Sequence, residues 1–405
     1  MRRGRPNAPA HYIWGTSLAA YTFARFTTAC ALEGLLPEWT ALYHATATSN
    51  PFAHPVWMAT WARHFVAPDD LYVVVVRDSA GELVAVAPFY RCHIAVGPGH
   101  VAMQLHLFGA GQHASLTELP QIVIRPGLER AALRAIVGYL SERVDEWDWV
   151  ELALTPEQGW VEPEWLPSDG PGRGSFALHK ATRPCVVLPL PSSWEELRGG
   201  LKRNVKESLR RGVNSLARAG HTWDVATSET TAELTRAVGA LIALHGARAR
   251  LQGTVRHDNY IARHADQAFL HDVARRMFAA GDLQVCLLRV DGAPTAARLL
   301  LHGHGATFLS LSGFAPAWAP YNVATTLTAA CLRRAIDHDD GMVNLSSGPD
   351  VAKLRWSEQL ELHQVFIMVG SRRRSRVAFA LHWHLRAAYH MRRESRRFGA
   401  EQCCP

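Results

Sequence analysis

Two pairs of short apolar runs stand out in the pattern of hydrophobic and polar positions along the chain. The pairs are residues 71–78 (LYVVVVRD) with 83–93 (LVAVAPFYRCH), and residues 283–290 (LQVCLLRV) with 295–302 (TAARLLLH). Each pair is joined by a short turn that contains a glycine, Gly81 or Gly292, which is typical of a β-hairpin. The pattern therefore predicts the same hairpin twice, a little over 200 residues apart.

The segments around the two hairpins follow one order. In the first half we expect strands near 21–28, 101–108 and 147–154 and helices near 35–46, 55–65 and 128–144. In the second half we expect strands at 221–227, 306–313, 342–345 and 363–369 and helices at 231–248, 259–279, 321–338 and 350–358. The order β-α-α-β-β-β-α-β predicts an α/β (α+β) protein of two similar domains, each a mixed twisted sheet flanked by helices.

A connector and a basic helix separate the two halves. Residues 155–183 are rich in Pro, Gly and Glu and are expected to be irregular, and residues 184–190 are expected to form a strand that completes the first sheet. A helix is predicted at 201–218, and its basic face consists of Lys202, Arg203, Lys206, Arg210, Arg211 and Arg218. This helix is either a solvated link between domains or a phosphate-binding helix that borders a cleft.

The predicted organisation has four parts. These are an N-terminal domain at 20–190, a basic linker helix at 191–220, a C-terminal domain at 221–370 and a basic C-terminal helix or tail at 371–405. The tail places many arginines around an apolar segment at 377–381, as a basic amphipathic helix does. Such helices can lie on anionic membranes or nucleic acid, but we expect the apolar stripe to pack on the domain with the arginines in water.

Composition is that of a globular protein with a basic surface. Hydrophobic residues make up 48% of the chain and charged residues 20%, which fits neither a disordered chain nor a membrane-spanning one. The formal net charge is +7, and most of the positive charge is arginine. A basic surface suits a polyanionic partner such as a CoA diphosphate, a nucleotide-sugar or tRNA. Coding bias is the other explanation for the preference for arginine over lysine.

Neither a metal site nor a disulfide framework is predicted. The seven cysteines show no close paired spacing, and the alternating pairs His302/His304 and His382/His384 lack a third ligand. A basic start precedes a mildly apolar stretch at 12–24, but its polar residues and the lack of a cleavage site argue against a signal peptide. No run approaches the ~18–20 apolar residues of a transmembrane helix. We therefore expect a cytoplasmic protein.

Four stretches carry a family resemblance. They are residues 51–57 (PFAHPVW) with Trp61, 201–205 (LKRNV), 244–248 (LHGAR) and 348–356 (GPDVAKLRW). In this order, on a duplicated fold, they resemble the Fem-type aminoacyltransferases and the acetyltransferase-like proteins of bacterial polysaccharide and natural-product gene clusters. The likeness covers roughly residues 20–370, with Ala352 where the family usually has tyrosine. It implies two GNAT-like domains and transfer of an acyl group to an amine in the cleft between them.

The resemblance also implies where the donor binds. In GNAT enzymes a helix N-terminus after the fourth strand holds the donor diphosphate through exposed backbone N–H groups. Here that segment follows Gly313 and opens the helix with Asn322, Val323, Ala324 and Thr325, and Arg203 on the basic helix is a further candidate. The usual arginine or glutamine and spaced glycines are absent. The donor is therefore expected to be an acyl-CoA (acetyl-CoA possible), a carrier thioester or, as the alternative, an aminoacyl-tRNA.

Four residues are candidates for the chemistry itself. Asp350 and Lys353 follow the fifth strand, where a carboxylate could help to deprotonate an ammonium and a lysine could hold a phosphate or an oxyanion. Their alternative is an i,i+3 ion pair on a short helix. His245 could act as a base or be structural, and Tyr321 could protonate a thiolate or simply pack.

Acceptor contacts are predicted from His113, Trp57 and Arg248. His113 lies in the glycine-rich stretch 108–115, which could hold a diphosphate or the acceptor, or simply form a turn, while Trp57 has core packing as its alternative. The leading hypothesis is an N-acyltransferase acting on a small-molecule, sugar or peptide amine. The alternatives are an aminoacyl-tRNA-dependent Fem-type transferase in natural-product or cell-wall biosynthesis, and a non-enzymatic scaffold at a polysaccharide synthase. No serine-hydrolase elbow or Walker loop occurs in the sequence.

Overall fold

A computed structural model describes residues 13–14, 21–111, 116–155, 175–251 and 257–401. The N-terminal half contains β1 (Ile13–Trp14), β2 (Thr22–Phe26), α1 (Ala29–Ala45), η1 (Pro51–Ala53), α2 (Pro55–Phe65), η2 (Pro68–Asp70), β3 (Leu71–Arg77), β4 (Leu83–Gly97), β5 (His100–Leu107), β6 (Val123–Ile124), α3 (Glu129–Ser141), β7 (Trp149–Leu154) and β8 (Phe176–Pro189). The C-terminal half contains α4 (Trp194–Gly200), α5 (Arg203–Arg218), β9 (Trp223–Thr227), α6 (Thr231–Ala249), α7 (His264–Ala280), β10 (Leu283–Val290), β11 (Ala293–Gly303), β12 (Ala306–Phe314), η5 (Pro316–Tyr321), α8 (Val323–Asp337), β13 (Met342–Ser347), α9 (Val351–Leu354), β14 (Leu360–Val369) and α10 (Arg373–Glu401).

The two halves repeat the same order of elements, as the sequence predicts. The series β2-α1-α2-β3-β4-β5-α3-β7-β8 corresponds to β9-α6-α7-β10-β11-β12-α8-β13-β14. Both predicted hairpins form, with β3 antiparallel to β4 and β10 antiparallel to β11. In each half a parallel pair follows, β5 with β7 and β12 with β13. The fold is therefore a duplicated mixed α/β sheet.

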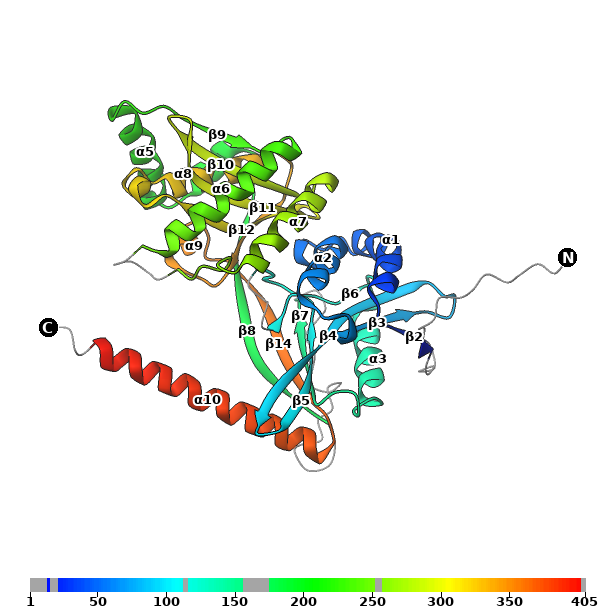
Figure 1. The fold of residues 1–405 in the computed structure, drawn as a ribbon. Helices are drawn as coiled ribbons and strands as arrows, with labels where there is room; N and C mark the ends of the chain where they lie inside the picture. The colour runs from blue at the N-terminus through cyan, green and yellow to red at the C-terminus, as the bar shows by residue number, and fades with distance from the viewer. Residues whose placement is uncertain (1–12, 15–20, 112–115, 156–174, 252–256, 402–405) are drawn as a thin grey trace.

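The last strand of each half lies in the sheet of the other half. All main strands form one sheet in the order β1-β2-β3-β4-β5-β7-β14-β8-β13-β12-β11-β10-β9. Thus β14 pairs with β7, and β8 runs between β14 and β13, so that the two long strands cross the junction side by side (Figure 1). The expectation that residues 184–190 complete the first sheet is wrong, because this segment pairs with β13 and β14.

The sequence also misses the first half of β8. Residues 155–183 read as an irregular connector, whereas a strand begins at Phe176. From Phe176 to Pro184 the side chains are half-buried or exposed on both faces, and only residues 185–188 are buried. The apolar alternation that identifies a half-buried strand is therefore absent from this segment. Pairing with β14 holds it in the sheet instead.

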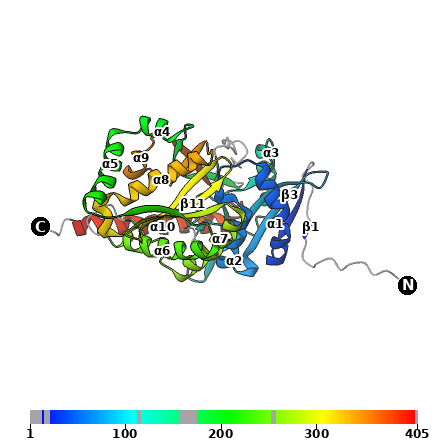
Figure 2. The ribbon, with the colours of Figure 1, turned by 90° about the horizontal axis from the view of Figure 1, so that it is seen from above.

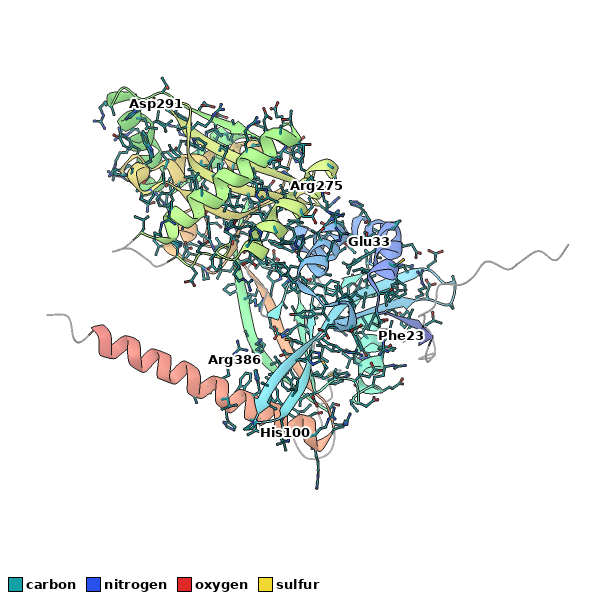
Figure 3. All side chains as sticks on the ribbon, in the orientation of Figure 1. Phe23, Glu33, His100, Arg275, Asp291 and Arg386 are labelled. Atoms are coloured by element: carbon teal, nitrogen blue, oxygen red, sulfur yellow. The ribbon has the colours of Figure 1, made fainter. Side chains whose placement is uncertain are left out.

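One of the apolar core clusters joins the two halves. Phe52 of η1 contacts Phe308 of β12 with ring centroids 5.0 Å apart, and Trp57 of α2 contacts Phe269 of α7 at 5.3 Å. A Cβ atom at Gly303 would come within 2.3 Å of the Ser49 carbonyl oxygen, so the backbones of the two halves nearly touch there. In Figure 1, α2 lies beside α7 at this junction, and Figure 3 labels Asp291 and His100 at opposite ends of the molecule.

Helix α10 only partly follows the packing that the sequence predicts. Its first turns dock on the sheet, where the Ser375 hydroxyl donates to Asp148 at 2.6 Å and Phe379 lies 5.6 Å from Trp149. Farther along, α10 extends away from the sheet (Figure 1). There Leu381 and Leu385 of the helix are 48% and 57% exposed. In the described residues, no helix is long and apolar enough to cross a membrane.

The exchange of last strands predicts that damage to β14 unfolds the N-terminal half. Met368 in β14 is fully buried in the core of that half, so Met368→Asp should lower the free energy of unfolding by about 4 kcal/mol or more. We expect hydrogen exchange in β3 and β7 to lose protection. The control Leu360→Asp changes an exposed residue of the same strand and should cost about 1 kcal/mol or less. Loss of protection confined to the C-terminal half would contradict the exchanged arrangement.

Candidate active site between the halves

The parallel strands β12 and β13 separate and open a cavity in the C-terminal half. They are in register only from Ala306 to Phe308, opposite Met342 to Asn344. Beyond these pairs lies a cavity of about 770 Å³. Its walls come from both halves of the chain, including Leu116, Thr117, Glu118, Thr182, Arg183, Pro184, His245, Arg248, Arg298, Ser310, Ser312, Ala324, Thr325, Ser346, Ser347, Asp350, Lys353 and Arg355.

Glu118 of the N-terminal half reaches into this opening. Its Oε1 accepts a hydrogen bond from the Ser310 hydroxyl of β12 at 2.9 Å. Its Oε2 accepts from the Ser346 hydroxyl at 2.5 Å and from the Ser347 backbone N–H and hydroxyl at 2.8 and 3.0 Å. The side chain of Glu118 therefore bridges the two diverging strands.

The loop that carries Glu118 is fixed by close packing. Gly109 has a φ of 83°, and a Cβ atom there would come within 2.3 Å of the Thr117 side chain, so only glycine fits. Trp57, which is fully buried, donates its indole N–H to the Thr117 hydroxyl at 2.9 Å. The Tyr90 hydroxyl donates to the Ala110 carbonyl at 2.8 Å. Trp57 thus holds the residue before Glu118 instead of lining the cavity.

The end of β13 adopts an unusual backbone conformation at the carboxylate. Ser346 has a φ of 81°, and the pairing of β13 with β8 shifts between Asn344 and Ser347. A non-glycine residue in this region costs on the order of 1–3 kcal/mol and persists only where its surroundings impose it. Here the Asn344 side chain accepts the Ser346 N–H at 2.8 Å, and Glu118 accepts the Ser346 hydroxyl. The bulge aims both serines at Glu118.

Lys353 and Asp350 lie together at the cavity, as the sequence predicts. The Lys353 Nζ donates to the Ser347 and Gly348 carbonyls at 2.5 and 3.1 Å and lies 3.9 Å from Asp350. Burial lowers the pKa of Lys353, and the positive charge of Arg298 lowers it further. The Glu118 and Asp350 carboxylates oppose this shift. Asp350 caps the short helix α9 by accepting the Lys353 N–H at 2.9 Å. Because Asp350 serves as a helix cap and Lys353 has a lowered pKa, Lys353 is a better candidate for proton transfer than Asp350.

Arg298 adds a cation whose side chain has no protein partner in the part of the chain that the structure describes. It lies on β11, which is internal to the sheet, and lines the cavity. Burial lowers its pKa, and the Asp350 and Glu118 carboxylates are among the charges that oppose the shift. A buried cation without a partner is costly in a protein interior. Its position therefore suits a negatively charged group of a ligand.

His245 is fixed as a neutral imidazole. Its Nδ1 donates to the Ser312 carbonyl at 2.8 Å, and its Nε2 accepts the Tyr260 N–H at 3.2 Å, so both ring nitrogens are occupied. Burial lowers its pKa, which also favours the neutral form. A Cβ atom at Gly313 would come within 2.2 Å of the His245 backbone N, so this glycine allows α6 to pack on β12. These contacts favour structural roles for both residues.

Arg248 and His257 form a second polar group in the cavity. The Arg248 Nη1 donates to the Ser312 hydroxyl at 2.8 Å, and its Nη2 donates to the His257 ring, 2.9 Å from Nε2. Its Nε is buried without a partner among the described residues. Burial and the neighbouring Arg298 lower the pKa of Arg248. The two arginines repel each other in the protein alone, and a bound anion would relieve that repulsion.

The first turn of α8 faces the cavity with Ala324 and Thr325. The backbone N–H groups of Val323 and Ala324 have no acceptor in the described part of the chain, whereas those of Thr325 and Thr326 donate to the Asn322 carbonyl. Free N–H groups at a helix start bind anions. The nearby Arg355 also has a buried Nε that lacks a partner among the described residues. Of the residues predicted for the donor at this turn, Ala324 and Thr325 line the cavity.

Several predicted residues lie elsewhere. Tyr321, at the end of η5, contacts Trp318 of the same element and His221, which precedes β9. Val323 has its side chain in the core. Asn322 caps α8 in a left-handed conformation, with its side chain outside the cavity lining. Arg203 is 92% exposed and pairs with Glu207. His113 lies outside the described residues.

Sequence reasoning missed Glu118, Arg298 and the serines of β12 and β13. Two signals point to them. Glu118 is the one acidic residue between Glu82 and Glu129, and it follows the glycine-rich stretch 108–115 by three residues. Arg298 interrupts an apolar strand, and Ser310 alternates with leucines in β12. Polar residues on an internal strand indicate a site, but only the structure brings Glu118 to them.

Comparisons with known proteins define the class. Residues 203–354 match the family described as "Acetyltransferase (GNAT) domain". The chain is therefore a GNAT-fold protein, with the acetyltransferase domain in its C-terminal half and the same order of elements repeated in its N-terminal half. No curated protein matches the chain. Among the described residues, no group of three or more histidines, cysteines and acids could hold a metal ion.

Three solved structures are similar to the chain to different degrees. FemX aligns with a TM-score of 0.51 at 10% identity, over 77% of this chain and 90% of FemX. The C-terminal domain of a putative lysylphosphatidylglycerol synthetase from Agrobacterium fabrum aligns at 0.49 and 12% identity, over 86% of this chain and 96% of that domain. A tandem GNAT protein from the clavulanic acid biosynthesis pathway aligns at 0.44 and 13% identity, over 87% and 99%. At these identities the FemX likeness shows a shared fold.

The packing role of Gly313 can be separated from a ligand-binding role. Gly313→Ala should lower the free energy of unfolding by about 2 kcal/mol or more, because the new methyl group meets the α6 backbone. The control is Gly239→Ala within helix α6. Its methyl group enters open space, and the change should stabilise the protein by about 0.5–1 kcal/mol. Urea unfolding of both variants measures the difference. Normal stability of Gly313→Ala with weakened donor binding would assign this glycine to the donor site instead.

Proposed function

We propose that the chain is an N-acyltransferase that moves an acyl group from a thioester donor to an amine in the cavity between the halves. The observation that carries this proposal is the placement of Glu118 within the opening of β12 and β13, beside Lys353 and Arg298. A GNAT-type domain supplies the acyl-transfer framework. The carboxylate supplies the attraction for a positively charged amine.

In this proposal Glu118, Lys353 and Arg298 have different roles, which follow from their charges. Glu118 attracts the ammonium group of the acceptor and holds it between the two strands. Lys353, whose pKa burial lowers, accepts a proton from this ammonium while it is neutral itself. The amine nitrogen then bonds to the acyl carbon, and Arg298 stabilises the negative charge that develops on the carbonyl oxygen. The bond from carbon to sulfur breaks, Lys353 returns its proton to the thiolate, and the second amine proton leaves to solvent.

The first turn of α8 supports a donor with a diphosphate. Its free Val323 and Ala324 N–H groups and the nearby Arg355 offer donors for phosphate oxygens. Acyl-CoA carries a diphosphate at the far end of its pantetheine arm from the thioester, so a diphosphate held at this turn leaves the arm to reach into the cavity, which favours acyl-CoA over an aminoacyl-tRNA. Helix α5 packs against this turn through Gly212, where a Cβ atom would come within 3.0 Å of Thr326 and Tyr321. The donor must therefore approach from the cavity side.

A turnover and binding screen tests the donor class. The full chain is mixed with acetyl-CoA, longer acyl-CoAs or aminoacyl-tRNA, and with amino sugars, amino acids and peptides as acceptors. We expect an acyl-CoA to raise the melting temperature and an amine to trigger thiol release. RNase-sensitive product formed only from aminoacyl-tRNA would replace this proposal with the Fem-type reaction. Absence of both binding and turnover would favour a scaffold.

Removing the charge of Glu118 should impair acceptor binding. Glu118→Gln keeps the size of the side chain but places an amide among hydroxyl and N–H donors, so kcat/KM for the amine should fall about 100-fold or more. Glu82→Gln removes an exposed acid of the same half and should change it by less than about twofold. Steady-state kinetics with the amine varied measures both. An unchanged kcat/KM in Glu118→Gln would remove this residue from the mechanism.

Lys353 should impose a pH dependence. Because the pKa of Lys353 is lowered from 10.5, kcat/KM should rise with pH until that lowered pKa and then level off. Lys353→Met and Lys353→Arg should both lose about 100-fold or more, since neither accepts a proton near neutral pH. Full activity in Lys353→Arg would show that a fixed cation suffices.

The lowered pKa of Lys353 also makes the stability of the folded chain depend on pH. Between the lowered pKa and 10.5 the unfolded chain binds the Lys353 proton and the folded chain does not, so folding gains stability as pH rises through this window. Compared with Lys353→Met, the wild type should therefore gain in free energy of unfolding from neutral pH towards about pH 10. Urea unfolding at both pH values provides the measurement.

A further inference from the structure

A second cavity, of about 820 Å³, lies in the C-terminal half and shares no lining residue with the cavity between the halves. It is a groove between α5 and α8, with β9 and β10 beneath and α4 at one end. Figure 2 shows α4, α5 and α8 on one side of the sheet and α6 and α7 on the other. The groove is thus an independent feature, and the acyl-transfer proposal makes no use of it.

The floor and walls of the groove are mainly apolar. They are formed by Leu209 and Val213 of α5, Val225 of β9, Cys286 of β10, Leu300 of β11, and Ala329 and Ala330 of α8. Val213 is 38% exposed although it faces this groove, and Trp223 at the edge is 36% exposed. Apolar surface at the base of a concave site favours a ligand that brings apolar surface of its own.

Cations surround this apolar floor. The lining includes Arg198, Lys206, Arg210, Arg333 and Arg334, while Asp337 is the one acidic residue among the lining residues that the structure describes. Three of the cations have local partners: Lys206 donates to the Gly199 carbonyl, Arg334 donates to Gln284, and Arg333 lies over the Trp194 ring. Arg198 and Arg210 have neither a hydrogen bond nor an ion pair within the described ranges. The charge is therefore uncompensated.

We propose that this groove binds an anionic single-chain amphiphile. The alkyl chain lies against Leu209, Val213 and Val225, whose side chains are at least partly exposed in the groove, and the phosphate or carboxylate head contacts Arg198 and Arg210. The volume of about 820 Å³ falls in the range of small-molecule sites, which are about 300–1,000 Å³. A nucleic acid would use the cations but would leave the apolar floor uncovered.

Alkyl phosphates of increasing length provide the test. Octyl, decyl and dodecyl phosphate are titrated into the full chain below their micelle-forming concentrations, by calorimetry. Affinity should rise about fourfold for each added methylene while the chain lies on the floor. Dodecanoate should bind as well, whereas dodecyltrimethylammonium and inorganic phosphate should bind at least about tenfold more weakly. Equal binding of the cationic amphiphile, or no gain with chain length, would overturn the proposal.

Matched variants locate the site. Arg210→Glu reverses a charge at the groove, while Arg211→Glu reverses the neighbouring charge on the same exposed helix outside the lining. We expect Arg210→Glu to weaken dodecyl phosphate binding about tenfold or more and Arg211→Glu to change it less than about twofold. Ala330→Trp should block the chain from the floor without altering the cations.

The same variants separate an amphiphile site from a polyanion site. If tRNA competes with dodecyl phosphate and binds Ala330→Trp as well as the wild type, the groove is a nucleic-acid surface and the proposal fails. If Arg210→Glu and Arg211→Glu weaken dodecyl phosphate binding equally, binding is a general effect of the basic helix and the proposal also fails.

Discussion

One carboxylate links the two halves at the place where the sheet opens. Where β12 and β13 separate, Glu118 of the other half accepts hydrogen bonds from the hydroxyls of Ser310, Ser346 and Ser347 and from the Ser347 backbone N–H. A typical intramolecular hydrogen bond contributes about 0.5–1.5 kcal/mol, so these four together hold the opening in one shape. The site therefore requires both halves of the chain.

The rest of the architecture serves to hold this bridge. Exchange of β8 and β14 makes the two sheets continuous, so the halves cannot rotate about a simple hinge between them. The aromatic contacts of Phe52 and Trp57 with the C-terminal half fix the same orientation from the other side. Trp57 also holds Thr117, next to Glu118. A residue that the family resemblance suggests as an acceptor contact thus acts on the site through the loop that it supports.

The cavity between the halves has more cationic than acidic lining residues among those that the structure describes. Arg248, Arg298 and Lys353 have their pKa values lowered chiefly by burial, and only Glu118 and Asp350 oppose this among the carboxylates that line the cavity in the described residues. His245 stays neutral because both ring nitrogens have backbone partners. The groove beside α5 has its own cations and its own apolar floor. Cations therefore gather at two separate cavities of the C-terminal half.

The sequence by itself determined most of the elements and the duplication. Hairpins, capped helices and strands arise from local apolar runs and turn chemistry, which residues 71–93 and 283–302 display directly. Tertiary structure alone decided that β8 and β14 exchange places and that Glu118 meets Ser346 and Ser347, more than 200 residues away. The reason is that strand pairing depends on backbone hydrogen bonds, which are alike for every sequence. Only the packing of the whole chain selects which edges meet.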